Sequence, residues 1–407
     1  MVTILQVVPR LDAGGSELAT IEIAQALSRA GASALVATEG GRMADEVGKA
    51  GGEIVTLPVA SKSPFTILAN IRRLTKLIKD RKVDLVHARS RAPAWSALLA
   101  ARRTGKPFVT TYHGAYGEVG PFKAAYNSVM AKGARVIANS RYTAAVIEAR
   151  APRAKDRIRV IYRGVDRYVF DPAAVDAQSV EKLRAAWGVP QGTKIVLHAA
   201  RLTSIKGQRD LIVAAALANA EGALRNAVVI LAGDTPGRDA YREELLGLIA
   251  RHGLGDKVRL VGHCREMPAA YLASQVAVTT STVPETFGRT SAEAQAMGCP
   301  VIVPDLGALP ETIVAQGQGQ TGFTGWLFPP RDIASLASRI GRALGLKAAE
   351  RAAIGVRARE HVAANFTLAQ MQEATLAVYD ELLGSDLAEK FKRASPAELG
   401  AGGTNDR

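Results

Sequence analysis

Short apolar runs alternate with helix-length segments along most of the chain, and this alternation narrows the possible folds more than any other feature. Parallel strands that are buried on both faces appear as continuous apolar runs, and each needs a crossover, usually a helix, before the next strand. Helical segments such as residues 17–29, 65–79 and 141–149 separate the first set of runs. That set comprises residues 4–8, 33–37, 53–57, 85–87, 108–111, 135–138 and 159–161. The first half is therefore predicted to form a doubly wound parallel sheet.

The same pattern restarts in the second half. The second set of runs comprises residues 194–198, 227–232, 258–261, 276–280 and 300–303. Between the two sets, residues 170–191 contain Pro172, Pro190 and a polar helical segment, which is typical of a linker. A chain of 407 residues also exceeds what one hydrophobic core holds. We predict an α/β fold of two doubly wound, Rossmann-like domains, residues 1–172 and 173–365, facing each other across a cleft at the carboxyl ends of their strands.

The cysteine, histidine and apolar patterns argue against several other classes of protein. The two cysteines, Cys264 and Cys299, lie far apart in sequence, which favours a reducing compartment and two buried structural thiols. The six histidines are scattered and no group has metal-ligand spacing, so we expect no metal and no cofactor. The apolar start of the chain has no basic region before it and is predicted to be a strand, not a signal peptide. No run approaches the roughly 18 apolar residues of a membrane-spanning helix.

Positive charge is concentrated in the first predicted domain. Residues 1–172 hold 27 Lys and Arg against 14 Asp and Glu, whereas the remainder holds 25 against 24. The formal net charge of +14 therefore comes almost entirely from the first domain. This asymmetry predicts an anionic partner there, either membrane lipid, a phosphorylated ligand or nucleic acid. The alternative is a solvated basic face without a partner.

Part of this charge falls on residues 71–82, a candidate basic amphipathic helix. Its apolar stripe consists of Ile71, Leu74, Leu77 and Ile78. Cations fill the other faces, and a helix of this kind suits contact with an anionic membrane surface, in which Arg72 and Arg73 would take part. The alternative is that the stripe packs on the protein's own sheet and the cations are solvated.

Residues 284–293 form the most informative short stretch. Glu285 and Glu293 stand eight positions apart, with the turn Phe287–Gly288 after the first and a small-residue helix under the second. A loop that leads into a helix offers backbone N–H groups, and the two carboxylates add acceptors for hydroxyl groups. We interpret the stretch as a site for a polyhydroxylated ligand. It suits a nucleotide sugar, which has hydroxyl groups at both ends and a diphosphate between them.

Two loops that follow strands have the features of a diphosphate site. Gly14 and Gly15 follow the first strand, where adjacent glycines permit close approach and a helix N-terminus favours negative charge. The alternative is a structural turn with Ser16 as the N-cap. Arg201 and Lys206 follow the first strand of the second domain and would grip a diphosphate from the opposite side, stabilising charge on a departing phosphate. The alternative for that loop is a solvated basic segment.

Two further strand ends carry histidine. His113 precedes Gly114 at a strand end, where it would face the predicted cleft and hydrogen-bond a hydroxyl group of a ligand. His87 opens a cationic loop with Arg89 and Arg91 that would meet an acidic ligand. For both histidines, a neutral structural role is the alternative.

Together these motifs resemble one family. The chain is similar to the retaining glycosyltransferases of the GT-B fold, specifically the large family 4, over about residues 2–385. The glutamate pair in its setting is quite specific, and the whole ordered series is very specific. The matching positions are 14–17, 113, 136–140, 164–166, 201 with 206–207, 232–234, 261–263, 285–293 and 297–302.

The resemblance implies a mechanism. The backbone N–H of Gly15 would contact the donor diphosphate, Arg201 and Lys206 would grip the same phosphates, and His113 would lie beside the transferred sugar and the acceptor. Members of the family work without a metal and retain the anomeric configuration by front-face attack, in which the donor phosphate takes the acceptor's proton. Neither glutamate then serves as a nucleophile.

The resemblance also implies how the donor is recognised. Glu285, with the N–H groups of Phe287 and Gly288, would hold hydroxyl groups of the transferred sugar. Glu293 would accept from the ribose hydroxyl groups, and the backbone near Gly262–His263 would meet the base.

One position departs from the family pattern. The residue before Gly164 is usually Asn in the family's Asn-Gly-Val-Asp, and here it is Arg163. This extra cation would favour an anionic acceptor, or it is a local substitution at a hinge. The loop 86–91 resembles those of bacterial enzymes that build lipopolysaccharide. The acceptor loop, residues 115–123, carries no readable specificity.

The expected activity is transfer of a hexose from a UDP- or GDP-sugar to a lipid-linked or polysaccharide acceptor, in lipopolysaccharide or other cell-envelope glycan synthesis. The first domain would bind the acceptor and the second the donor, a helix within residues 366–385 would cross back to the first domain, and residues 386–407 would be a disordered tail. The enzyme is expected in the cytoplasm, peripheral on the inner face of the plasma membrane.

Other functions stay open at this point. An epimerase on the same fold would need acid/base carboxylates and histidines that the sequence does not place. A glycosyl phosphorylase would be much longer and would carry a pyridoxal lysine. A basic nucleic-acid-binding module would need an aromatic-rich basic motif, and aromatic residues make up only 5% of the chain.

Overall fold

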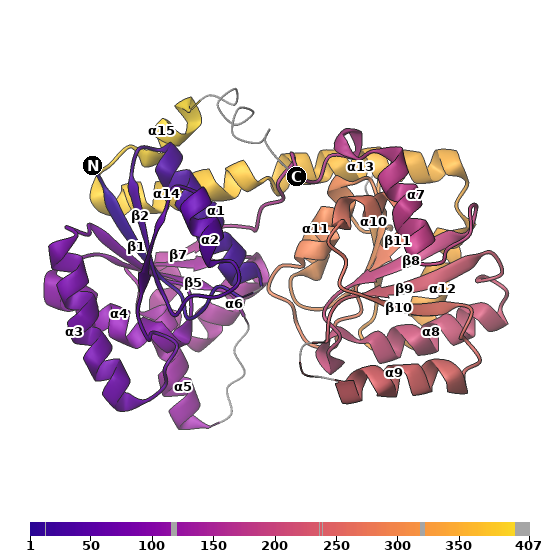
Figure 1. Cartoon of the computed structure of the whole chain (residues 1–407), viewed down its shortest axis with the longest axis horizontal. Helices are drawn as coiled ribbons and strands as arrows, with labels where there is room; N and C mark the ends of the chain where they lie inside the picture. The colour runs from indigo at the N-terminus through magenta and orange to yellow at the C-terminus, as the bar shows by residue number, and fades with distance from the viewer. Residues whose placement is uncertain (13, 115–119, 236, 238, 318–321, 395–407) are drawn as a thin grey trace. The chain divides into compact units, whose positions relative to one another are not determined.

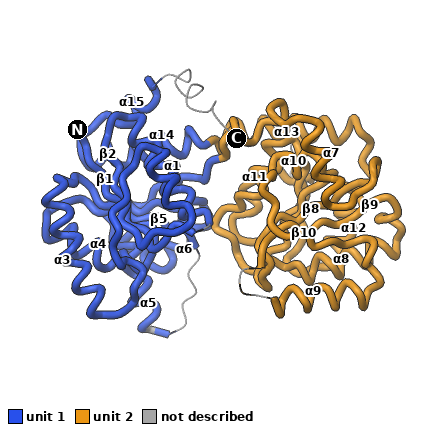
Figure 2. Tube along the Cα trace, in the orientation of Figure 1, with its two compact units in different colours: residues 1–164, 368–407 blue, residues 165–367 orange. Residues whose placement is uncertain are grey.

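A computed structural model of the chain describes residues 1–12, 14–114, 120–235, 237, 239–317 and 322–394. The chain divides into two compact units, shown in different colours in Figure 2. Unit 1 comprises Met1–Gly164 with the segment from Leu368 onward, and unit 2 comprises Val165–Thr367. The chain thus enters unit 2 at Val165, before the predicted boundary at residue 172.

Unit 1 is built on a seven-stranded parallel sheet in the order β3-β2-β1-β4-β5-β6-β7 (Figure 1). The strands are β1 (Thr3–Val7), β2 (Ser33–Thr38), β3 (Glu53–Thr56), β4 (Leu85–Ala88), β5 (Phe108–Tyr112), β6 (Arg135–Ala138) and β7 (Ile158–Val160). The helices are α1 (Gly15–Arg29), α2 (Ala44–Lys49), α3 (Pro64–Asp80), α4 (Arg91–Thr104), α5 (Pro121–Asn127), α6 (Arg141–Arg150), α14 (Leu368–Leu383) and α15 (Leu387–Arg393).

Helices cover both faces of this sheet, which explains why its strands are apolar throughout. Ile4 and Leu5, neighbours on β1, are both 0% exposed. Leu5 joins the core under α3 and α4, whereas Ile4 joins the core under α1, α14 and α15. The predicted doubly wound sheet is therefore present in unit 1.

The C-terminal segment completes the second of these faces. Helix α14 belongs to unit 1, although it follows unit 2 in sequence. Part of the tail predicted as disordered forms helix α15, which buries Leu387 and Phe391 against unit 1 and places the Arg29 guanidinium 4.6 Å from the Phe391 ring centroid. Two apolar anchors and a cation–π contact order this short helix. Residues 395–407 lie outside the described part of the chain.

Unit 2 repeats the architecture with a six-stranded parallel sheet in the order β10-β9-β8-β11-β12-β13. The strands are β8 (Lys194–Ala199), β9 (Ala227–Ala232), β10 (Val258–Gly262), β11 (Val276–Val278), β12 (Val301–Pro304) and β13 (Gly325–Phe328). The helices are α7 (Ala177–Ala186), α8 (Gln208–Ala220), α9 (Asp239–Arg251), α10 (Met267–Ala273), α11 (Arg289–Ala296), α12 (Ile333–Gly345) and α13 (Ala348–Asn365), with short 3₁₀ turns η3 (Pro172–Ala174), η4 (Ser204–Lys206) and η5 (Leu309–Thr312).

The two sheets confirm the predicted fold class, two Rossmann-like α/β domains. In each sheet the strand order changes direction at one point, between β1 and β4 in unit 1 and between β8 and β11 in unit 2. Ligands of open parallel sheets bind outside the carboxyl ends of the strands at this switch point. The loops after these four strands are therefore the expected ligand-binding positions.

Candidate active site

In unit 2 the loops after β8 and β11 are joined to each other. The N–H of Thr282 donates to the carbonyl of Ile205 at 3.0 Å, and the hydroxyl of Thr280 lies 3.0 Å from the carbonyl oxygen of Gly207. The loop after β12 joins them, because Ala308 N–H donates to the Glu285 carbonyl at 2.9 Å. Three strand ends thus hold one continuous polar surface.

Lys206 and Glu285 form the centre of that surface. Lys206 ends the turn η4, and its Nζ donates to Oε1 of Glu285 at 2.6 Å. The Ser281 hydroxyl donates to the same oxygen. Burial alone would raise the pKa of the Glu285 carboxyl, but the Lys206 ammonium and these hydrogen bonds lower it below its ordinary value. Glu285 is therefore a carboxylate held in place by two donors.

Gly207 determines where the lysine sits. It has φ +69° and serves as the N-cap of α8, and a Cβ at this position would lie 1.8 Å from the carbonyl oxygen of Thr280. Only glycine fits this close approach to the loop after β11. The sequence Lys206-Gly207 is thus needed for the two loops to meet.

His198, a residue of β8 with no role predicted from the sequence, lies beneath the same loops. It is 1% exposed, and its Nε2 donates to the Lys206 carbonyl at 3.1 Å. Burial lowers the pKa of His198 to about 4, so the ring is neutral at physiological pH. Its only sequence signal was a polar residue inside an apolar strand.

Arg201 lies in the loop after β8 and is exposed. Its carbonyl accepts from the Gln208 amide at 3.0 Å, which ties the loop to the start of α8. The guanidinium group is therefore accessible to an anion. Arg201 and Lys206 therefore belong to one loop, as predicted, with Lys206 already committed to Glu285.

Glu293 stands on α11 and is also held by neighbours. Its Oε1 accepts from Arg289 Nε at 2.9 Å, and its Oε2 lies 3.5 Å from the Tyr271 hydroxyl. The Glu293 side chain is 13% exposed. Burial, reinforced by the charge of Glu293, raises the pKa of Tyr271 well above its ordinary value, so the phenol stays protonated. The carboxylate is thus fixed and retains capacity for further donors.

Phe287 and Gly288 lead into α11. Gly288 has φ +100° and is the N-cap of the helix, and the Phe287 ring packs edge-on against Phe366 with centroids 5.5 Å apart. A Cβ on Gly288 would lie 2.4 Å from the Leu309 side chain. The first turn of α11 is therefore fixed, and N–H groups at a helix N-terminus can donate to oxygen acceptors.

Gly262 and His263 are exposed at the end of β10. The Gly262 carbonyl accepts from the Gly233 N–H at 2.7 Å, so the ends of β9 and β10 are joined beside the β8 loop. Their backbone is accessible at the same edge of the sheet as Arg201.

In unit 1 the glycine pair lies at the switch point between β1 and β4. Gly14 is the N-cap of α1, and Gly15 is its first residue. Ser16 does not cap the helix, since its hydroxyl donates to Glu17 Oε2 at 2.6 Å. The structural alternative for this turn, capping by Ser16, is therefore wrong. The N-terminus of α1 carries N–H groups and one nearby carboxylate.

His113 and Arg163 are brought together from the ends of β5 and β7. Arg163 is 7% exposed, and its guanidinium donates to Nδ1 of His113. Burial, and then the charge of Arg163, lower the pKa of His113 well below its ordinary value. Since arginine only donates, Nδ1 of the neutral ring must be the acceptor and Nε2 must carry the hydrogen. Arg163 thus fixes the tautomer of His113.

The loop after β4 is less accessible than expected. Arg89 is 2% exposed and donates through Nε to the Gln6 side chain at 2.9 Å, so it does not present its guanidinium at a surface that could meet an acidic ligand or a membrane, as predicted for this loop. His87 is fully buried between the Tyr379 and Thr111 hydroxyl groups, both at 2.7 Å, which makes it structural. Arg91 donates to the Asn127 side chain at 2.8 Å from the start of α4.

The apolar stripe on α3 faces the core. Ile71, Leu74 and Ile78 are at most 2% exposed, which contradicts a membrane role for that stripe and confirms that it packs on the protein's own sheet. Arg72 and Arg73 lie on the exposed side of the helix. Among the described helices, none combines the length and the hydropathy that crossing a membrane requires.

The loops at the carboxyl ends of the unit 2 strands therefore offer cationic groups and hydrogen-bonding groups to a ligand. An exposed guanidinium and an ammonium suit phosphate oxygens, and two fixed carboxylates suit hydroxyl groups. Within the described residues, no group of three His, Cys, Asp or Glu side chains is placed to hold a metal ion.

Comparisons with known proteins match both units. Residues 13–168 match the family model described as Glycosyltransferase Family 4, and residues 179–361 match Glycosyl transferases group 1. D-inositol 3-phosphate glycosyltransferase 1 of Catenulispora acidiphila is 31% identical over 313 residues, which are 73% of this chain and 72% of that protein.

Solved structures agree with these matches. A glycosyltransferase from Rickettsia africae is 34% identical with a TM-score of 0.84, covering 95% of this chain and 99% of that one. Anabaena Alr3699/HepE, solved in complex with UDP and glucose, shares the fold at 24% identity with a TM-score of 0.80, covering 94% and 100% of the two chains.

Proposed function

We propose a donor and an acceptor class for this chain, which belongs to glycosyltransferase family 4 and carries its group 1 transferase domain. It transfers a hexose from a UDP- or GDP-sugar to a lipid-linked or polysaccharide acceptor of the cell envelope, with retention of anomeric configuration. The observation that carries the donor assignment is the Lys206–Glu285 pair, 2.6 Å apart at the switch point of the unit 2 sheet and beside Arg201.

Lys206 and Arg201 hold the diphosphate of the donor. In the transfer step the bond between the anomeric carbon and the diphosphate oxygen breaks, and negative charge grows on that oxygen. Cations fixed beside it stabilise the transition state more than the ground state. The acceptor oxygen forms the new bond on the same face of the sugar, and its proton passes to the departing diphosphate.

Glu285 orients the sugar and does not attack it. Its Oε1 is already engaged by Lys206 and Ser281, and a carboxylate held by two donors is a poor nucleophile. The other oxygen accepts from a sugar hydroxyl group. Glu293, fixed by Arg289, accepts in the same way from the ribose, and the backbone of Gly262–His263 borders the base.

His113 and the first turn of α1 serve the reacting end of the substrates. The hydrogen on His113 Nε2 is donated to a hydroxyl group of the transferred sugar, because Arg163 occupies Nδ1. Gly15 offers a backbone N–H to the diphosphate.

A second acceptor, inositol phosphate, is favoured by the names of the relatives. The Catenulispora protein is called a D-inositol 3-phosphate glycosyltransferase. An anionic acceptor also agrees with the basic balance of residues 1–172. To distinguish the two acceptors, a lipid-linked glycan and inositol 3-phosphate are each incubated with the enzyme and the same labelled donor, and transfer of the label to each is measured.

The test of the donor is a panel of UDP- and GDP-sugars, scored by thermal shift and then by product formation. A donor that binds the folded chain raises its melting temperature, and the product must be an α-linked glycoside if the donor is α-linked. Epimerisation of the sugar in the absence of an acceptor would instead indicate an epimerase. Release of the sugar by inorganic phosphate would indicate a phosphorylase.

Metal independence is part of the same proposal. Activity is expected to persist in excess chelator, because Arg201 and Lys206 supply the positive charge that a metal would otherwise bring. Complete loss of activity on chelation, restored by a divalent cation, would contradict this mechanism.

A further inference from the structure

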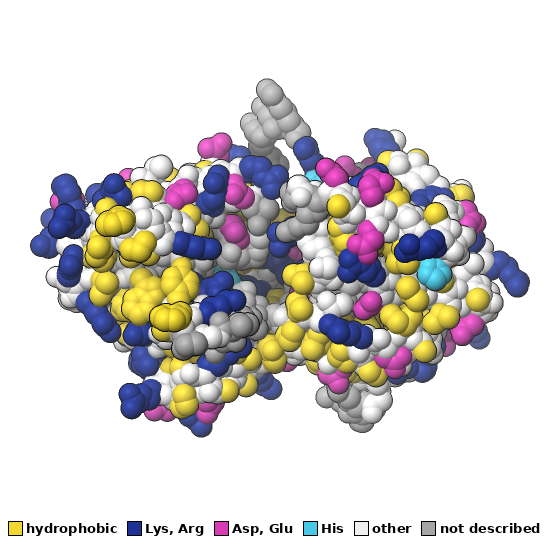
Figure 3. All heavy atoms as spheres, turned by 90° about the horizontal axis from the view of Figure 1, so that it is seen from below, with side chains coloured by type: hydrophobic (Ala, Val, Ile, Leu, Met, Phe, Trp, Pro, Cys, Tyr) yellow, Lys and Arg dark blue, Asp and Glu magenta, His cyan; other side chains and the backbone are white. Residues whose placement is uncertain are grey.

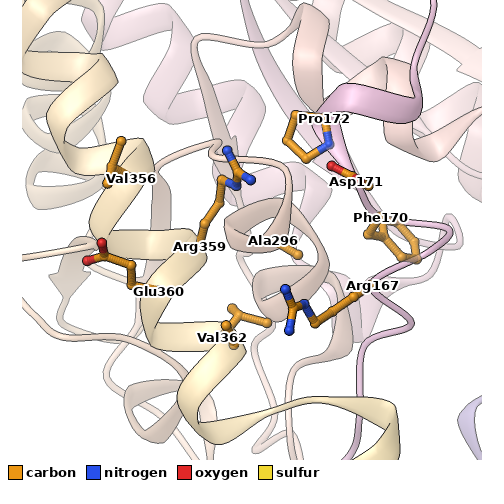
Figure 4. A pocket seen from close by; sticks show the side chains of 10 residues that line it. Arg167, Phe170, Asp171, Pro172, Ala296, Val356, Arg359, Glu360 and Val362 are labelled. Atoms are coloured by element: carbon orange, nitrogen blue, oxygen red, sulfur yellow. The ribbon is translucent and has the colours of Figure 1, made fainter. Parts of the chain in front are cut away.

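A cavity of about 380 Å³ lies in unit 2, and none of its lining residues belongs to the loops that form the candidate active site. Its walls are the segment that enters unit 2, residues 167–172, helix α13 and the end of α11 (Figure 4). Cavities that bind small molecules begin at about this size. Nothing in the proposed transfer reaction uses these walls.

Two arginines cross this cavity in opposite directions. Arg359 starts on α13 and extends toward Pro172, whereas Arg167 starts on the entering segment and extends toward Val362 (Figure 4). Within the described part of the chain, neither guanidinium group has a hydrogen-bond or ion-pair partner. Because no described carboxylate forms an ion pair with either of them, the two guanidinium groups are suited to bind an anion in the cavity.

The remaining lining suits the rest of a polar ligand. Phe170 offers a ring, Ala296 and Val362 form a buried apolar floor, and Asp171 contributes a carboxylate whose Oδ1 accepts from the Ala173 N–H. Glu360 adds a second carboxylate at the exposed rim. Carboxylates repel a simple anion, but they accept hydrogen bonds from hydroxyl groups.

We propose that this cavity binds a sugar phosphate. The terminal phosphate lies between Arg167 and Arg359, since its three oxygens can serve two guanidinium forks, whereas a carboxylate is satisfied by one. The hydroxyl groups donate to Asp171 and Glu360, and the C–H face of the sugar packs on Phe170. The site is separate from the donor site, so the proposal does not depend on which nucleotide sugar the enzyme uses.

Because of the position of the cavity, a bound ligand is expected to stabilise the two segments that connect unit 2 to the rest of the chain. The chain enters unit 2 at Val165 and leaves it at Thr367, and these two residues form a parallel bridge in which Val165 N–H donates to the Phe366 carbonyl at 2.8 Å. A ligand that links residues 167–172 to α13 holds both connecting segments together. It is therefore expected to slow hydrogen exchange at the Val165 amide.

The experiment is calorimetric titration of the full chain with glucose 6-phosphate, with glucose and inorganic phosphate as partial probes. We expect binding of glucose 6-phosphate to weaken at least tenfold in the double variant Arg167→Ala/Arg359→Ala. The matched control is Arg342→Ala, which removes an exposed arginine on α12, and the donor-site control is Lys206→Ala; both should bind as the unaltered chain does. Equal melting temperatures establish that each variant is folded.

Three results would overturn the proposal. They are no binding to the unaltered chain, equal binding to the double variant, and loss of binding in Lys206→Ala alone, which would place the probe in the donor site. Exchange at Val165 that does not slow when the probe is bound would remove the linkage to the connecting segments.

Discussion

Lys206 is positioned by one hydrogen bond to Glu285, and the other N–H groups of its ammonium can donate to phosphate oxygens. For this reason Lys206→Ala is expected to lower kcat by about 100-fold or more, the effect of removing one preorganised donor from a developing charge. Glu293→Ala should instead raise the donor Kd by about 10-fold, since it removes charged acceptors of the ribose without touching the reacting centre. Steady-state kinetics with direct donor titration separates the two effects.

Arg209→Ala is the matched control for that pair of variants. Arg209 follows Lys206 closely in sequence, but it is exposed and pairs with Glu244 on α9. Its loss should leave both kcat and donor affinity within about twofold. Normal turnover in Lys206→Ala would contradict the assignment of the donor diphosphate to this loop.

His198 makes stability depend on pH. Its folded pKa of about 4 lies below the ordinary 6.5, so the neutral ring stabilises the fold fully above pH 6.5 and the contribution is lost as pH falls toward 4. At pH 5 the unfolded chain binds the proton and the folded chain does not, which costs about 2 kcal/mol. His198→Gln should remove this part of the difference in unfolding free energy between pH 7 and pH 5, measured by denaturant titration. An unchanged difference would mean that His198 titrates normally.

The functional role of a single residue could be predicted where the residue belongs to a sequence motif. Contacts between residues that are distant in sequence could not be predicted, because only the fold brings them together. The Lys206 and Glu285 positions followed from their loops and from the family resemblance. Their direct contact did not, because 79 positions separate them in sequence. Arg163 and His113 are a second example, since their pairing depends on the β5-β6-β7 order and no local pattern signals it.

Among the elements, the junction between η4 and α8 is the most constrained. Gly207→Ala combines a left-handed φ with a Cβ placed 1.8 Å from the Thr280 carbonyl oxygen. Gly253→Ala has nearly the same φ, +64°, but meets nothing within 4 Å, so it isolates the backbone cost of roughly 1–2 kcal/mol. We expect Gly207→Ala to lower the melting temperature well beyond Gly253→Ala and to weaken donor binding. Equal melting temperatures for the two variants would show that the loops after β8 and β11 can move apart without loss of stability.

Strands and long helices were predictable because their periodicity is local, and the exceptions have tertiary causes. The second set of predicted runs omitted β13, a four-residue strand that begins with Gly325. A Cβ there would lie 2.4 Å from the Val301 carbonyl oxygen, so the glycine that hides the strand from sequence reasoning is what lets it pair with β12. Helix α15 was missed because its seven residues are stabilised by Leu387 and Phe391 packing on unit 1, not by their own pattern.

For the whole molecule, the uneven charge and one face of α3 bear on where the enzyme works. Hydrophobic side chains gather on unit 1, at the left of Figure 3, with Lys and Arg around them. On α3, Phe65 and Leu68 are 84% and 61% exposed, and Arg72 continues the same exposed stripe at helical spacing. This stripe lies on the side of α3 away from the buried one, so it is the face of the helix that can contact a membrane.

The chain is therefore expected to bind anionic vesicles in a salt-dependent manner and not to bind oligonucleotides. Each cation near an anionic surface contributes about 1 kcal/mol, so Arg72→Ala/Lys79→Ala should weaken vesicle partitioning by roughly 30-fold. Phe65→Ser/Leu68→Ser should weaken it further at high salt, where the apolar contribution dominates. Arg342→Ala, in unit 2, is the control and should have no effect. Equal partitioning to neutral and anionic vesicles, or tight binding of an oligonucleotide, would assign the charge of unit 1 to another partner.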